Sequence, residues 1–219
     1  MKINLPRNIS PREAIKLQTK LSTLVKQTSE LSTRIRNLVG CDATYTSGVT
    51  IAAATHLSYD SLRLLKIRAV SEPTRFPYLP GLLAFREGPA VLRAIRGLRV
   101  KNYVCLVDAH GIAHPRKFGL ACYVGLALDQ PTIGVAKSIL YGQVNGNRLV
   151  DKDGSILAEL VLTPGGKTIY VSVGHKIALE DAVSIVKHSM GSGGPLPIRL
   201  AHDEVTKERW RRKNSNQAS

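Results

Sequence analysis

The sequence has little cysteine, few aromatic side chains and few acidic residues. Of 219 residues, three are cysteines, and Phe, Trp and Tyr together make up 5%. The three cysteines, Cys41, Cys105 and Cys122, are odd in number and widely spaced, which argues against a disulfide framework and a cysteine-ligated zinc site. No stretch approaches the roughly 18 consecutive apolar residues of a membrane span, and the opening MKINLPRNIS lacks the apolar core of a secretory signal. We therefore expect a cytoplasmic protein that does not enter a membrane.

The scarcity of acids leaves a large positive charge. Sixteen Asp and Glu face 31 Lys and Arg, so the formal net charge is +15. The surplus is spread along the chain: residues 1–38 carry eight basic and two acidic residues, and residues 63–101 carry nine and two. A basic surface built into a fold is typical of proteins that bind a polyanion, most often nucleic acid. The alternative is a charged surface that serves solubility alone.

The hydrophobic pattern predicts one domain over residues 1–205 and a basic, polar and mobile tail over 206–219. Ser10 and Glu13 form a helix-start signal, and leucines then recur at helical spacing, so we expect a long helix over about 11–37. Alternating runs joined by tight turns predict antiparallel strands at 38–45, 49–57 and 62–72.

The second half of the chain alternates helices with buried strands. Its expected elements are a helix at 81–98 with a new segment starting at Pro89, a strand at 103–107, a helix at 117–128, and strands at 131–135 and 168–173 followed by a helix at 178–190. Antiparallel strands followed by this alternation predict an α/β fold with a mixed sheet and helices on both faces. Ribonuclease H-like nucleases have this order of elements.

Three acids lie within structured elements of this basic chain. Asp42 lies inside the first predicted strand, Glu87 in a basic helix, and Asp108 at the end of the buried strand 103–107. Buried carboxylates need a cation or hydrogen-bond donors, and Mg²⁺ prefers oxygen ligands of this kind. A metal site and three separate pairings with arginine both remain open from the pattern alone.

Six motifs, in this order, resemble the endonuclease V family of deoxyinosine-specific nucleases over roughly residues 11–202. They are GCDATY (40–45), PYLPGLLAFREGP (77–89), VDAHGIAHPRKFGLA (107–121), PTIGVAKS (131–138), YVSVGH (170–175) and PIRLAH (197–202). The resemblance implies a ribonuclease H-like fold and the use of Mg²⁺ or Mn²⁺. It also implies hydrolysis of the second phosphodiester bond 3′ to deoxyinosine in DNA, leaving a 3′-hydroxyl and a 5′-phosphate.

The resemblance also assigns catalytic roles. Asp42, Glu87 and Asp108 match the metal-binding carboxylates of the family. His202 matches its active-site histidine, with a role near the attacking water or a metal. Lys137 is expected to contact a phosphate or to stabilise charge close to the metal.

Further matches concern the damaged base. Pro77, Tyr78, Leu79 and Pro80 match a stiff wedge that fills the gap in the base stack when the lesion leaves the helix. The matches around the base pocket are Gly81, Leu83, Ala109, His114 and Gly119. Hypoxanthine has an acceptor at its six-position where adenine has a donor, so a backbone N–H aimed there would distinguish the two.

Some positions depart from the family pattern. Ala109 stands where glycine is common, and Leu79 replaces a more usual isoleucine; neither touches the metal carboxylates. Two alternatives remain: a binding protein that keeps the fold without catalysis, and a nuclease whose main substrate is inosine-containing RNA. We expect a monomer.

Overall fold

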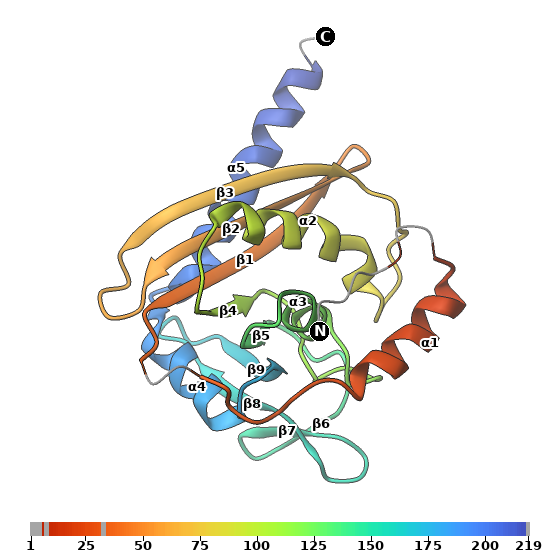
Figure 1. Cartoon of the computed structure of the whole chain (residues 1–219), viewed down its shortest axis with the longest axis vertical. Helices are drawn as coiled ribbons and strands as arrows, with labels where there is room; N and C mark the ends of the chain where they lie inside the picture. Colours follow the sequence, from red (N-terminus) through yellow and green to blue (C-terminus); the bar gives the residue numbers. More distant parts are fainter. Residues whose placement is uncertain (1–5, 7–8, 32–33, 218–219) are drawn as a thin grey trace.

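The computed structural model describes residue 6 and residues 9–31 and 34–217. Figure 1 shows their arrangement. The helices are α1 (Pro11–Ser22), α2 (Leu83–Leu98), α3 (Leu120–Leu128), α4 (Leu179–His188) and α5 (Leu196–Gln217). The strands are β1 (Asn37–Thr46), β2 (Val49–Ser58), β3 (Leu64–Pro73), β4 (Tyr103–Val107), β5 (Thr132–Ala136), β6 (Gln143–Asn145), β7 (Arg148–Val150), β8 (Ile156–Leu162), β9 (Thr168–His175), β10 (Met190–Gly191) and β11 (Gly194–Pro195).

The main sheet is mixed, as predicted. Its order is β3-β2-β1-β4-β5-β9-β8-β7-β6. The first three strands form an antiparallel meander, whereas β4 runs parallel to both β1 and β5. Every residue of β4 and β5 is buried, because strands at the centre of a sheet with helices on both faces have no solvent-facing side.

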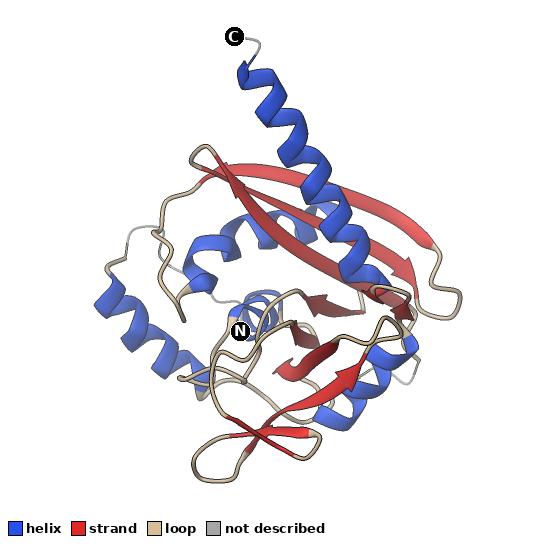
Figure 2. Cartoon of the chain, turned by 180° about the vertical axis from the view of Figure 1, so that it is seen from behind, coloured by secondary structure: helices blue, strands red, loops and turns tan. Residues whose placement is uncertain are grey.

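Helices cover the two faces of the sheet. α2 packs against β1, β2 and β3 and also against α3, while α5 packs on β1 and β2. The two views in Figures 1 and 2 place α2 and α5 on opposite sides of these strands. The prediction of helices on both faces is therefore confirmed. Pro89 does not begin a new segment, because α2 runs through it without a break; the buried side chains on either side of Pro89 offset the one backbone hydrogen bond that proline removes.

The predicted helix over 11–37 is wrong, because α1 ends at Ser22. The hydroxyl groups of Ser22 and Thr23 donate to Thr19 O and Lys20 O at 2.8 and 2.9 Å, which gives the backbone an alternative to further helix. Beyond this point the chain pairs with a distant segment instead. Residues 32–33 lie outside the described part.

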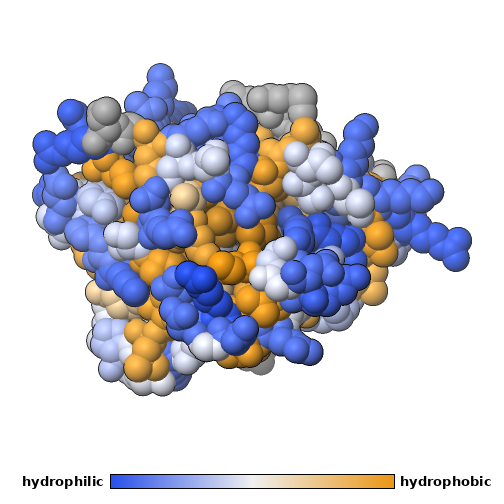
Figure 3. Space-filling model, turned by 90° about the horizontal axis from the view of Figure 1, so that it is seen from below, coloured by the Kyte–Doolittle hydropathy of each residue, from blue (hydrophilic) through white to orange (hydrophobic). Residues whose placement is uncertain are grey.

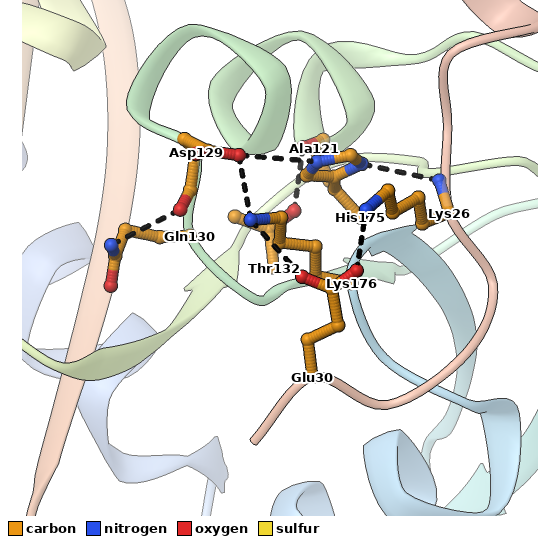
Figure 4. A network of polar contacts seen from close by, with 8 residues as sticks. All are labelled: Lys26, Glu30, Ala121, Asp129, Gln130, Thr132, His175 and Lys176. Atoms are coloured by element: carbon orange, nitrogen blue, oxygen red, sulfur yellow. Dashed lines mark hydrogen bonds and ion pairs between the residues drawn. The ribbon is translucent and has the colours of Figure 1, made fainter. Parts of the chain in front are cut away.

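Residues 26–30 run beside the end of β9 and the turn that follows it. Lys176 N–H donates to Lys26 O at 2.8 Å, and Glu30 N–H donates to Lys176 O at 3.0 Å. The ammonium of Lys176 also bridges Asp129 at 2.7 Å and Glu30 at 3.2 Å (Figure 4). Tertiary contacts thus replace the helix that the leucine spacing predicts in this segment.

The predicted basic and polar tail over 206–219 is helical as far as Gln217, where α5 ends, and its mobility stays a prediction. Val205 packs with Ala201 against Ile51 and Ala53 of β2, which holds the middle of α5 on the sheet. The following turns are polar but still helical, and Figure 2 shows them projecting from the body. Residues 218–219 lie outside the described part.

On the face seen in Figure 3, hydrophilic side chains surround a central group of hydrophobic ones. Within the described residues, none of the helices combines the length and apolar character needed to cross a bilayer.

Gly40 of β1 allows α5 to approach the sheet. A methyl group at Gly40 would lie 2.2 Å from the carbonyl carbon of Pro197, in the first turn of α5. We expect Gly40→Ala to lower the free energy of unfolding by about 1–3 kcal/mol, since backbone must move to admit the methyl group. Gly191→Ala is the control, because its nearest neighbour would lie 3.5 Å away. Urea denaturation of both variants tests this, and equal stability would contradict the close packing.

Candidate active site

Three elements bring two acids and a histidine together. Asp42 lies in β1, Asp108 directly follows β4, and His202 lies in α5. Asp108 N–H donates to Cys41 O at 3.0 Å, which extends the β1–β4 pairing by one residue and sets the two acids side by side. One ligand atom each of Asp42, Asp108 and His202 lies within 4.8 Å of the others.

Charge is concentrated in this cluster. Burial raises the pKa of Asp42, and the nearby Asp108 carboxylate raises it further, while the hydrogen bond with His202 opposes both. His202 Nδ1 lies 2.8 Å from Asp42 Oδ2. Because an ionised carboxylate only accepts hydrogen bonds, Nδ1 carries the proton and Nε2 is left as an acceptor in the neutral ring. Lys137 Nζ donates to Asp108 Oδ2 at 2.5 Å.

The donor set of this cluster fits a divalent cation. Two carboxylates whose mutual repulsion disfavours ionisation would both be stabilised by a positive ion between them. Carboxylate oxygens suit Mg²⁺, and carboxylates with an imidazole also suit Mn²⁺.

Glu87 is not part of this group. It lies in α2, where it is 7% exposed, and its carboxylate accepts a hydrogen bond from the hydroxyl group of Tyr45. Burial raises its pKa to about 8, and the charges of Asp42 and Asp108 contribute to that rise. Glu87 therefore lies close enough for the charges of Asp42 and Asp108 to affect its pKa. Its role as a metal ligand stays a prediction.

Tyr45 is a site residue that the motif comparison did not single out. The strand alternation places it on the opposite face of β1 from Asp42, and Arg86 stacks on its ring at 4.2 Å from the centroid. The GCDATY motif contained Tyr45, but only the fold shows that its hydroxyl group meets Glu87.

A cavity of about 190 Å³ adjoins the cluster. All eight predicted substrate-binding residues line it, namely Tyr78, Leu79, Pro80, Gly81, Leu83, Ala109, His114 and Gly119. Two lining residues directly follow cluster residues in the chain, since Ala109 follows Asp108 and Ser138 follows Lys137. The sequence analysis missed seven lining residues: Gln18, Ala84, His110, Leu120, Ser138, Ile139 and Leu140.

The wall formed by residues 79–82 is a tight turn. Leu82 N–H donates to Leu79 O at 2.9 Å. Pro80 is the second residue of the turn, and Gly81 is the third with a φ of +77°, the combination favoured in type II turns. The turn leaves Tyr78 67% exposed at the mouth of the cavity.

Three side chains hold the carbonyl group of Gly81. Its oxygen accepts from Gln18 Nε2 at 3.0 Å, from His114 Nε2 at 2.9 Å and from Arg116 Nη2 at 2.7 Å. Gln18 Nε2 also donates to Phe118 O at 2.9 Å, and its Oε1 accepts from Arg116 Nε at 2.7 Å. We call Gln18, His114 and Arg116 the Gly81 clamp.

The clamp fixes the protonation of its histidine. Arg116 N–H donates to His114 Nδ1 at 3.1 Å, so the ring proton lies on Nε2, where it can donate to Gly81 O. Burial lowers the pKa of His114 to about 4, and the ring is therefore neutral at physiological pH.

Comparison with known proteins decides the family. The sequence model of endonuclease V matches residues 19–203. The chain belongs to the endonuclease V family. It is 47% identical over 173 residues to endonuclease V of Desulfurococcus amylolyticus, covering 77% of this chain and 79% of that protein. It is 43% identical over 184 residues to the Aeropyrum pernix protein, covering 81% and 71%.

Solved structures agree with this assignment. The crystal structure of human endonuclease V superposes with a TM-score of 0.85 at 25% identity, covering 93% of this chain and 100% of that one. A Ciona intestinalis endonuclease V in complex with a 23mer DNA containing an inosine followed by a ribo-adenosine gives 0.82 at 25% identity, covering 93% and 99%. The predicted family, its ribonuclease H-like fold and its nuclease activity are confirmed.

Gln18 is buried in α1, with 0% of its surface exposed. We expect Gln18→Leu to lower the free energy of unfolding by roughly 1–3 kcal/mol, because Phe118 O and the Arg116 guanidinium lose buried partners. Lys16→Leu introduces the same residue at an exposed position of α1 and should leave stability near that of the wild type. Chemical denaturation compares the two, and a stable Gln18→Leu protein would contradict the clamp.

His114 should make stability depend on pH. Its folded pKa of about 4 lies below the usual 6.5, so the stability that it contributes is present above pH 6.5 and is lost as pH falls toward 4. Between pH 7 and pH 5 the loss is about 2 kcal/mol. His114→Gln keeps an N–H donor without titrating, and its unfolding free energy should fall less over this interval. Denaturation curves at both pH values would contradict this if the two proteins lost equal stability.

Proposed function

We propose that the protein is a Mg²⁺-dependent endonuclease that recognises deoxyinosine in DNA and acts in the repair of deaminated adenine. It hydrolyses the second phosphodiester bond 3′ to the lesion and leaves a 3′-hydroxyl and a 5′-phosphate. The observation that carries the proposal is the cluster of Asp42, Asp108 and His202 together with a cavity lined by the predicted base-binding residues, one of which, Ala109, directly follows Asp108. The inosine in the nucleic acid bound by the Ciona protein supports the same substrate.

Each member of the cluster has a distinct proposed role. Asp42 and Asp108 hold the divalent cation, and Glu87 completes its site; Mn²⁺ also supports activity. When bound, the cation lowers the pKa of a water molecule and stabilises charge on the departing oxygen. Lys137, which already donates to Asp108, stabilises the charge of the cleaved phosphate.

The proposed role of His202 is that of a general base. Its Nδ1 proton is held by Asp42, so Nε2 is free to accept the proton of the attacking water. Its side chain is 55% exposed, which leaves room for a phosphodiester and water beside it.

The cavity selects the base. Tyr78 projects from a loop stiffened by Pro77 and Pro80 and fills the gap that the extruded nucleotide leaves in the stack. A backbone N–H facing the six-position of hypoxanthine gains an acceptor, whereas the amino group of adenine leaves that donor unpaired. The Gly81 clamp holds the wall of the cavity in one orientation, so the donor does not turn to accommodate adenine.

Inosine-containing RNA is a second candidate substrate. The nucleic acid in the Ciona complex carries a ribo-adenosine after the inosine, so at least one relative binds a ribonucleotide next to the lesion. Parallel rates on DNA and RNA with the same lesion separate the two candidates. A monomeric state and a cytoplasmic location stay predictions.

The test is cleavage of a duplex that carries one deoxyinosine, in the presence of Mg²⁺. The wild type should nick the lesion strand at the second phosphodiester bond on its 3′ side. Asp108→Ala should reduce the rate by roughly 10³-fold or more, because a ligand of the cation is lost, while binding to the same duplex persists.

Asp203→Ala is the matched control, because it removes an exposed acid beside His202 that pairs with Arg199 at 3.5 Å. It should nick at the wild-type rate. A wild type without lesion-dependent nicking would overturn the proposed function, whereas an active Asp108→Ala would overturn only the metal assignment.

A further inference from the structure

The last turns of α5 lie beyond the part of the chain that the family model matches. That match ends at residue 203, whereas α5 continues to Gln217. Residues 206–217 contain one acid, Glu208, against five bases, which are Lys207, Arg209, Arg211, Arg212 and Lys213. Figures 1 and 2 show this half of α5 projecting away from the sheet. The most basic short segment of the helix is thus also the one least used in packing.

One face of this projection continues from the active site. His202, Thr206, Arg209 and Lys213 are spaced by four, three and four residues. An α-helix advances about 100° per residue, so these four side chains share one face. His202 belongs to the catalytic cluster, and at about 1.5 Å per residue Lys213 lies roughly 16 Å further along the helix axis. We call Thr206, Arg209 and Lys213 the α5 stripe.

Strand β1 fixes the first cation of the stripe. Arg209 Nη1 donates to the hydroxyl group of Thr44 at 3.4 Å. Thr44 is two residues after Asp42 in β1, so both side chains lie on the same face of the strand. Arg209 therefore stands beside the strand that supplies one of the two clustered acids, with further donors left on its guanidinium group.

Trp210 borders the stripe. It lies three residues before Lys213 and four after Thr206, and it is 65% exposed. It is also the only tryptophan in the chain. A large aromatic side chain left in solvent between cationic neighbours is typical of surfaces that contact nucleic acid.

Two of the remaining cations of the projection point elsewhere. Lys207 and Arg211 lie five and nine residues after His202 and four residues apart, which places both on the side of the helix away from the His202 face. Arg211 forms an ion pair with Glu208 on its own helix. The helix thus carries two pairs of cations on different faces, of which the pair in the α5 stripe is continuous with the active site.

We propose that the α5 stripe binds successive phosphates of the substrate duplex as it leaves the active site, with Trp210 against the sugar–phosphate edge. This inference rests on the proposed function and adds a contact surface to it. The roughly 16 Å between His202 and Lys213 corresponds to about five base pairs at 3.4 Å each. The contact therefore requires duplex on one side of the cut that extends about this far.

The experiment compares two double variants of the full chain. Arg209→Gln with Lys213→Gln removes the stripe cations, and Lys207→Gln with Arg211→Gln removes two cations from the other face. Both lower the formal net charge from +15 by the same amount. Binding is measured with a labelled deoxyinosine duplex in EDTA, so that it is not followed by cleavage.

The stripe variant should bind on the order of tenfold more weakly, and the slope of log K against log salt should fall by about 2, one for each lost phosphate contact. The other variant should keep wild-type affinity. In the wild type, Trp210 fluorescence should change as the duplex saturates the protein. Shortening the duplex to about two base pairs on one side of the cut should abolish the difference between the variants.

Equal weakening in both double variants would mean a general charge effect and would overturn the inference. So would tryptophan emission that stays constant at saturation. Both outcomes differ from failure of the proposed function, in which the wild type itself does not nick the deoxyinosine duplex in Mg²⁺.

Discussion

The repulsion between two carboxylates is the constraint on which the active site depends. Asp42 and Asp108 are held side by side because Asp108 N–H continues the β1–β4 pairing by donating to Cys41 O. The backbone of the central sheet thus imposes a contact that the charges oppose. Burial raises the pKa of Asp42 most, and the charge of Asp108 raises it further. Lys137 and His202 offset part of this repulsion from two other elements. A positive ion between the two carboxylates would offset the rest, which is why we propose that the cluster binds a divalent cation.

The candidate catalytic cluster and the cavity share short segments of chain. The residue after Asp108 and the residue after Lys137 both line the cavity, so in the proposed function the same segments would position the base and the cleaved phosphate. The opposite wall is a turn that needs the positive φ of Gly81, and three donors from two other segments fix its carbonyl group. The proposed site must bind the six-position oxygen of hypoxanthine and exclude the amino group of adenine. Such selection benefits from a cavity wall that cannot rotate.

The sequence pattern predicted those elements whose structure depends on residues close together in the chain. The buried strand over residues 103–107 has the predicted bounds. Its apolar run and the turn after it can both be recognised from consecutive residues. The prediction of helix beyond Ser22 was wrong, because residues 26–30 form backbone hydrogen bonds with Lys176, which follows β9. The only sign of Gln18 in the sequence is that a polar residue stands between Ala14 and Leu21 on the buried face of α1. Its partners Gly81 and Phe118 are 63 and 100 residues away.

The motifs predicted the site better than the element pattern did. They carry the side chains that chemistry requires, and Asp42, Asp108 and His202 converge even though His202 is 160 residues from Asp42. The motifs did not predict the hydrogen bond between Glu87 and Tyr45, because it depends on how α2 crosses β1. The helical continuation of α5 past Val205 was missed for the same reason, since polar composition does not show that Arg209 reaches Thr44.

The most direct test of the shared cation is an anomalous difference map from crystals of the protein equilibrated with Mn²⁺. The account predicts one strong peak within about 2.0–2.4 Å of carboxylate oxygens from both Asp42 and Asp108. At saturating Mn²⁺, a map without a peak between these two residues, or with the peak bound to only one of them, would contradict it.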